Sequence, residues 1–206
     1  MNKRTLLALA ATTSALLLGG CATQDIGSYA NQQPTLDLQQ YFNGTLDAYG
    51  VFTDRSGAVV KRFTVLMLCT WTGDTGVLHE DFNYSDGTKQ TRIWKLTKRG
   101  NGRFDGRADD VVGEAHGESR GNAFHWTYTL SLPIGDKPSD ALPPQGASAP
   151  TGGSAAREAA SVEARTVNVQ FDDWMYLMTD KVMLNKAAMS KFGVRLGEVT
   201  LSFTKR

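Results

Sequence analysis

The chain has 206 residues, of which 22 are lysine or arginine and 21 are aspartate or glutamate. This near-neutral balance argues against nucleic-acid binding, which needs a strongly basic surface. Two cysteines, Cys21 and Cys69, are too few for a disulfide framework, so stability has to come from a packed core.

The first 20 residues have the order of a secretory signal, with a basic start, an apolar run from Leu6 to Leu18 and two glycines before Cys21. The run is shorter than the ~20 residues that a membrane-spanning helix needs. Leu18-Gly19-Gly20-Cys21 resembles the lipobox of bacterial lipoproteins. The resemblance implies that residues 1–20 are a signal peptide and that Cys21 carries a diacylglycerol and a further acyl chain such as palmitate. The alternative is a signal peptide that ends beside a structural cysteine.

Residues 21–36 contain Gln, Ser, Asn and Pro and few large apolar groups, which indicates a lipidated tether. Residue 22 is Ala and not Asp, which under the sorting rule of enteric lipoproteins favours the outer membrane. We therefore expect a protein anchored by lipid to the periplasmic face of the outer membrane.

Residues 37–206 show a series of strand patterns separated by turn residues. Apolar side chains alternate with polar ones around Phe63–Trp71, Phe124–Leu132, Val167–Phe171 and Val199–Phe203, which is the period-two signature of strands buried on one face. Glycine-containing turns separate these strands. The stretch from Ala187 to Phe192 suggests a helical turn before the last strand.

A low-complexity segment over residues 133–163 contains five of the six prolines. It is too poor in large apolar side chains to bury anything, so we predict a disordered insertion in a hairpin loop. The whole pattern predicts an all-β domain, a single antiparallel up-and-down barrel of about 8–10 strands. A two-sheet sandwich would give much the same local pattern.

Several segments carry a family resemblance: FNGTLDAYGVFTDRSG, EDFNYSDGT, DDVVGEAHG, GNAFHWTYTL, VQFDDWMYLM and VMLNKAAMSKFGVRLGEVTLSF. They resemble the proteobacterial lipoprotein family known as domain of unknown function 3833. The resemblance covers about residues 37–206 without the insertion. It implies a lipobox lipoprotein with a lipocalin-like fold, and it transfers no catalytic residue.

Several catalytic and metal-binding patterns are weak in this sequence. Gly117–Gly121 matches G-x-S-x-G, but a strand pattern follows where a nucleophile elbow needs a helix. His79, His116 and His125 lack the short spacing of zinc ligands. Acidic clusters at Glu80-Asp81, at Asp109-Asp110 with Glu114 and at Asp172-Asp173 suit general acid-base work or calcium, but solvated strand ends explain them better. We expect no cofactor, no metal and no enzymatic activity.

The densest group of aromatic and acidic residues is Phe171–Tyr176, which indicates either a packed core or the mouth of a ligand pocket. Arginines are candidate partners for a fatty-acid carboxylate or a lipid phosphate, because a guanidinium binds such groups with two hydrogen bonds. The candidate ligand-binding residues are Arg92, Trp94, Trp126, Asp172, Asp173, Trp174, Tyr176 and Arg195, with Trp71 as a further pocket or core aromatic.

The leading hypothesis is a non-enzymatic, lipid-anchored barrel that binds an acyl-chain or lipid ligand, for example a fatty acid or a phospholipid. The alternative is an envelope interaction module with an unknown protein partner, which a solidly filled interior would favour. A lipid-modifying enzyme is the third hypothesis, and its sign would be a buried carboxylate next to an arginine in an open cavity.

Overall fold

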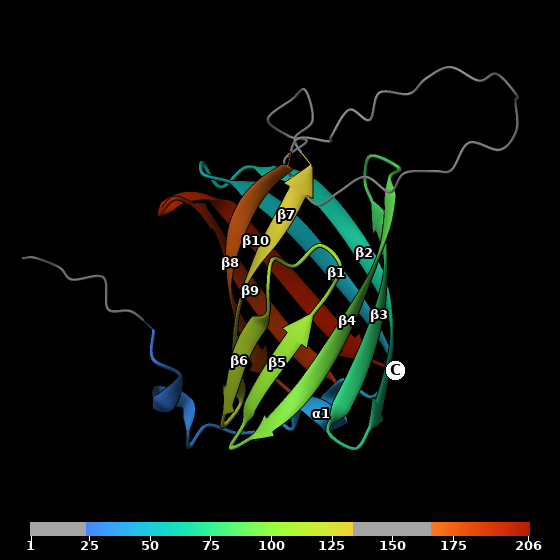
Figure 1. The fold of residues 1–206 in the computed structure, drawn as a ribbon, viewed down its shortest axis with the longest axis vertical. Coiled ribbons are helices and arrows are strands. Elements are labelled where there is room, and N and C mark those ends of the chain that lie inside the picture. The colour runs from blue at the N-terminus through green and yellow to red at the C-terminus, as the bar shows by residue number, and fades with distance from the viewer. Residues whose placement is uncertain (1–23, 134–165) are drawn as a thin grey trace, which may run out of the picture.

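The computed structural model describes residues 24–133 and 166–206. Ten antiparallel strands in these residues close into one barrel (Figure 1). Each strand pairs with its neighbours in sequence, and the first pairs with the last, so the predicted up-and-down barrel is confirmed and the sandwich is excluded. The strands are β1 Gly44–Asp54, β2 Val59–Thr72, β3 Thr75–Tyr84, β4 Lys89–Gly100, β5 Arg103–Arg107, β6 Ala115–Arg120, β7 Ala123–Pro133, β8 Thr166–Leu177, β9 Val182–Lys191 and β10 Val194–Lys205.

Burial alternates along the strands because successive side chains point to opposite faces of a sheet. In β2, Val65, Met67 and Cys69 are buried in the interior, whereas Leu66 and Leu68 face outward and are exposed. The same alternation places Phe171 of β8 and Phe203 of β10 inside. The strand rows predicted from the sequence are therefore confirmed.

The helical turn predicted for residues 187–192 is wrong. Strand β9 covers most of that stretch and pairs with β8 on one side and β10 on the other. Ala187 and Met189 point inward and are buried, so pairing on both edges outweighs the local helix preference of the sequence. Phe192 lies at the tip of the β9–β10 hairpin and is exposed.

A single helical turn, α1 (Leu38–Tyr41), closes one end of the barrel (Figure 1). Asp37 caps it, because its carboxylate accepts a hydrogen bond from the Gln40 N–H at 3.0 Å. Leu38 and Tyr41 are buried, and the Tyr41 hydroxyl donates to the Phe203 carbonyl of β10 at 3.2 Å. This turn ties the start of the domain to its last strand.

Residues 24–36, expected to be part of a tether, pack against the outside of the barrel. The 3₁₀ turn η1 (Ile26–Tyr29) places the Tyr29 ring 5.9 Å from that of Trp174, between ring centroids. The Leu36 N–H donates to the Gly121 carbonyl at 2.7 Å, and the Leu36 side chain is buried. Tyr29 and Leu36 thus hold this polar segment on the barrel, and the lipidated tether over residues 21–36 stays a prediction.

The predicted insertion lies between β7 and β8, which pair up to Pro133 and Thr166, so its position in a hairpin connection is confirmed. Its remaining residues, the predicted signal peptide and Cys21 lie outside the described residues. In the described ranges, no helix has both the length and the apolar character needed to cross a bilayer.

We expect Tyr29→Ala to release the N-terminal segment, because it removes the ring that packs on Trp174 and Tyr176. Amide hydrogen exchange over residues 24–35 should become faster, while exchange in the strands stays unchanged. Gln32→Ala, at an exposed position in the same segment, is the control and should leave both rates unchanged. Equal exchange in the Tyr29→Ala variant and the natural chain would show that the ring does not hold the segment.

Candidate ligand cavity

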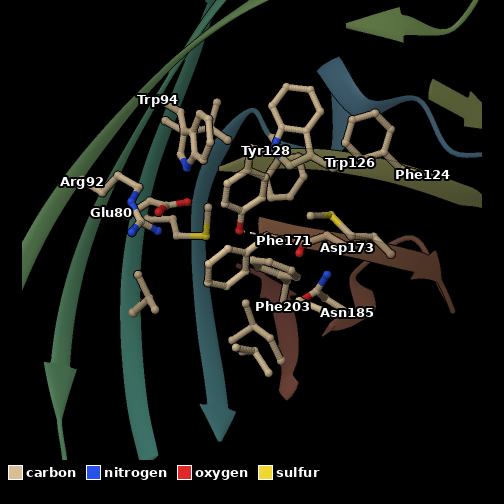
Figure 2. A pocket seen from close by; sticks show the side chains of 18 of the residues that line it. Glu80, Arg92, Trp94, Phe124, Trp126, Tyr128, Phe171, Asp173, Asn185 and Phe203 are labelled. Atoms are coloured by element: carbon tan, nitrogen blue, oxygen red, sulfur yellow. Dashed lines mark hydrogen bonds between the residues drawn. The ribbon is translucent and has the colours of Figure 1, made fainter. Parts of the chain in front are cut away.

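The barrel interior contains a cavity of about 120 Å³. Leu38 and Phe42 line it at the end that α1 closes, and Phe52 and Phe63 line it toward the other end. The wall between them is mostly aromatic and aliphatic (Figure 2). The interior is therefore not solidly filled.

Trp94 and Trp126 form much of one wall, as edge-to-face neighbours with ring centroids 5.7 Å apart. Strands β5 and β6 make room for Trp126 with glycines on their inner faces. A Cβ atom added at Gly106 would lie 2.7 Å from this ring, and one added at Gly117 would lie 2.3 Å from it. The two tryptophans thus lie in the cavity wall, where the sequence hypothesis put them.

Arg92 is the cationic side chain among the described residues that line the cavity. Its guanidinium donates to Asp110 from Nε at 3.0 Å and from Nη2 at 2.6 Å. Glu80 faces the cavity from the neighbouring strand, opposite Arg92 in register. Asp110 belongs to the β5–β6 connection, which reaches the barrel wall through a bridge between Val111 and Leu130 of β7.

Asp173 lies on another part of the wall and is buried (Figure 2). The Tyr128 hydroxyl points toward it and donates to Asp173 Oδ2 at 3.2 Å. Asp173 Oδ1 has no hydrogen-bond partner among the described residues. Asn185 is also buried in this wall.

Burial governs the protonation of these acids. Desolvation raises the pKa of Glu80 to about 7, although the Arg92 guanidinium opposes the rise. Desolvation also raises the pKa of Asp173 to about 7, against the hydrogen bond from Tyr128 and with the help of the Asp172 charge. Both carboxyl groups therefore titrate near neutral pH.

Cys69 lies in the buried interior as a free thiol. Desolvation raises its pKa to about 12, and the Glu80 charge acts in the same direction. The thiolate is the reactive form of cysteine, so this thiol is chemically quiet at neutral pH.

Four of the predicted ligand-binding residues do not line the cavity. Asp172, Trp174 and Tyr176 are on the outer face of β8, because they alternate with the inward-facing Phe171 and Asp173. Trp174 is nevertheless buried, between Tyr29 and the stacked ring of His125.

Asp172, Tyr176 and Arg195 each contact another side chain outside the cavity. Asp172 is 2.7 Å from His125 Nε2, and Tyr176 contacts the ring of Tyr29. Arg195 is exposed near the β9–β10 hairpin and forms an ion pair with Glu198. These residues, with Trp174, are removed from the candidate site.

The other sequence motifs have structural explanations in the described residues. Each histidine pairs with a different aspartate: His79 with Asp81, His116 with Asp105 and His125 with Asp172. Asp105, Glu114 and His116 lie close enough to share an ion, but Arg99 and Arg107 already pair with the two carboxylates. Ser119 is in β6 and is followed by a turn and β7, so Gly117–Gly121 is not a nucleophile elbow.

The sequence hypothesis missed Glu80, Asp110, Tyr128 and Asn185 as members of one site. Glu80 and Asp110 stood out only as parts of acidic pairs. One signal was present for Tyr128, because it belongs to the same alternating row as Trp126 and Leu130. No pattern within one strand shows which acids of distant strands meet.

The molecule is thus a closed ten-stranded β-barrel with an internal, mostly apolar cavity and a few polar side chains in its wall. The chain belongs to the family described as protein of unknown function (DUF3833), which matches residues 15–141 and 158–205. The unmatched residues between these ranges fall inside the predicted insertion. No match was found among curated proteins.

Two solved structures illustrate what this chain is similar to. An S-type phycobiliprotein lyase, CPES, from Guillardia theta has a TM-score of 0.51 at 6% identity, over 89% of this chain and 98% of that one. A de novo designed fluorescence-activating β-barrel has a TM-score of 0.40 at 12% identity, over 83% of this chain and 99% of the design. At these identities the likeness to the lyase concerns the fold alone.

The raised pKa of Asp173 predicts a pH-dependent effect of Asp173→Asn. In the unfolded chain this pKa is ~3.9, so the folded state binds the extra proton between about pH 4 and pH 7. The contribution of Asp173 to stability therefore falls as the pH rises through this window and stays low above it. Denaturant unfolding at several pH values measures this effect. Between pH 5 and pH 8, the free energy of unfolding of the Asp173→Asn variant should rise relative to that of the natural chain by on the order of 1–3 kcal/mol.

Asp172→Asn is the matched control, because it removes a neighbouring carboxylate from the outer face of the same strand. Asp172 is exposed, and its loss should change the free energy of unfolding by less than ~1 kcal/mol. If the stability of the Asp173→Asn variant ran parallel to that of the natural chain across this pH range, the raised pKa would be wrong.

Proposed function

We propose that the barrel binds one amphipathic ligand in its interior, with an acyl chain or a similar apolar part in the cavity. The supporting observation is a mostly apolar cavity that carries a small polar cluster in its wall. Small-molecule sites combine these two features, because apolar contacts supply affinity and a few polar groups fix orientation. An apolar cavity of ~150 Å³ holds a benzene-sized molecule. A volume of about 120 Å³ therefore suits a short chain or the end of a longer one.

We also propose that the protein acts as a lipid-anchored lipoprotein on the periplasmic face of the outer membrane. The lipobox resemblance supports the anchor at Cys21. Gln24 contacts the Tyr176 hydroxyl on the outer face of β8. Three residues of chain span at most ~11 Å, so a lipid on Cys21 would hold this side of the barrel close to the bilayer surface. A lipid could then exchange between membrane and barrel over a short distance.

A lipid-modifying enzyme is the second candidate, because one specific observation favours it. Glu80 faces the cavity opposite Arg92, and its pKa of about 7 suits general acid-base catalysis near neutral pH. The two candidates differ in the fate of the ligand. A binding protein releases the ligand unchanged, whereas an enzyme releases it with a changed mass. An interaction module with a packed interior finds less support, since the interior holds a cavity.

The test is native mass spectrometry of the full chain purified from membranes in a non-ionic detergent. A binding protein should carry a co-purifying acyl-chain molecule or take up an added one, and the ligand mass should stay constant over hours. A change in ligand mass would favour the enzyme. If no such molecule co-purifies or binds when added, the binding proposal fails.

We expect Ala187→Leu to abolish ligand uptake. Ala187 lines the cavity from β9, and leucine adds three carbon atoms to a space of about 120 Å³. Uptake is measured by native mass spectrometry and by a change in the intrinsic tryptophan fluorescence of the chain, because two of its four tryptophans, Trp94 and Trp126, lie in the cavity wall. The melting temperature should change little, because the added atoms enter existing space.

Ala188→Leu is the matched control, because it adds the same group to the outer face of the same strand. This variant should bind as the natural chain does. Undiminished uptake by a folded Ala187→Leu variant would place the ligand elsewhere. Should Ala187→Leu not fold, Ala187→Val makes the same test with less added volume.

A further inference from the structure

The cavity wall contains an unsatisfied hydrogen-bond acceptor. Asp173 is 6% exposed, and its Oδ1 has no hydrogen-bond partner among the described residues. The other oxygen of this carboxyl group accepts from Tyr128. Buried acceptors are nearly always paired, since leaving one unpaired is destabilising. The free oxygen therefore indicates that a donor from a bound molecule belongs at this place.

The charged groups around the cavity also favour a hydrogen-bond donor as the ligand's polar group. Glu80 and Asp173 line it together with Arg92, and Arg92 is already engaged by Asp110 through two of its nitrogens. Among the described residues, the cavity wall and the Asp110 beside it thus hold three carboxyl groups and one guanidinium. A ligand carboxylate would bring a fourth acid into this region and would meet a cation that already has a partner. Interactions between charges are strong in such a water-poor interior.

We propose, building on ligand binding as the function, that the polar group of the ligand at Asp173 is a hydrogen-bond donor, an ammonium or a hydroxyl, and that the cavity disfavours carboxylates. This replaces the expectation that Arg92 binds a fatty-acid carboxylate. An ammonium can donate to Oδ1 and offsets one of the two negative charges that Glu80 and Asp173 carry when both are ionised. A hydroxyl can donate to Oδ1 without adding charge. A free fatty acid does neither when it is ionised.

Three ligands with the same chain separate these cases: octylamine, octanol and octanoate. Binding to the full chain in non-ionic detergent at pH 8 is followed by native mass spectrometry, and signal from the Ala187→Leu variant is subtracted as adventitious partitioning. We expect octylamine to bind tightest and octanoate weakest. The difference should be about 10-fold or more, because hydrogen bonds to ionised groups are the strong ones.

Variants assign the selectivity to Asp173. Asp173→Asn should reduce the preference for octylamine over octanoate by about 10-fold, whereas Asp172→Asn on the outer face should leave it unchanged. Tyr128→Phe provides a second test if the first variant does not fold. It frees Asp173 Oδ2 from its present donor, so the preference for octylamine should be kept or increased.

The outcomes separate this inference from the proposed function. Octanoate binding as tightly as octylamine, or an undiminished preference for octylamine over octanoate in the Asp173→Asn variant, would overturn the donor inference and leave ligand binding intact. Failure of all three ligands to bind above the Ala187→Leu background would overturn ligand binding itself, and the donor inference with it.

Discussion

Pairing between β1 and β10 is the constraint on which the rest of the structure depends. It runs from Leu46 and Lys205 to Asp54 and Gly197, and it leaves the sheet without an exposed edge. Closure also gives every second side chain of ten strands the same interior. Asp173 of β8 is far in sequence from Glu80 of β3 and Arg92 of β4, yet all three residues line one small volume because the sheet closes.

The barrel interior contains ionisable side chains that a stable hydrophobic core does not need. Replacing buried ion pairs with apolar side chains is often neutral or stabilising, so the Arg92–Asp110 pair is weak evidence for a structural role. Glu80 and Asp173 add two acids whose ionisation burial makes unfavourable. The surrounding apolar side chains lower the local dielectric constant, which strengthens the interaction of these acids with any bound group. Such an arrangement suits recognition of a ligand better than it suits packing.

Much of the fold could be predicted from period-two patterns, since one face of each strand is buried. The site was harder to predict, because neighbouring side chains of one strand point to opposite faces of the sheet. Val169 and Phe171 set the phase of β8 and put Asp173 inside, but Trp174 is large, apolar and buried on the outer face. The cover that buries it comes from Tyr29, in the segment predicted to be a tether. Contacts between such distant segments leave no mark on local periodicity.

The two faces of β8 make different contacts. On the outer face, Trp174 and Tyr176 hold the N-terminal segment, and on the inner face Asp173 lies in the cavity wall. Strand pairing with β7 and β9 fixes both faces relative to each other. A residue docked on Trp174 is therefore held at a constant distance from Asp173. The attachment surface and the polar wall of the cavity are thus parts of the same element.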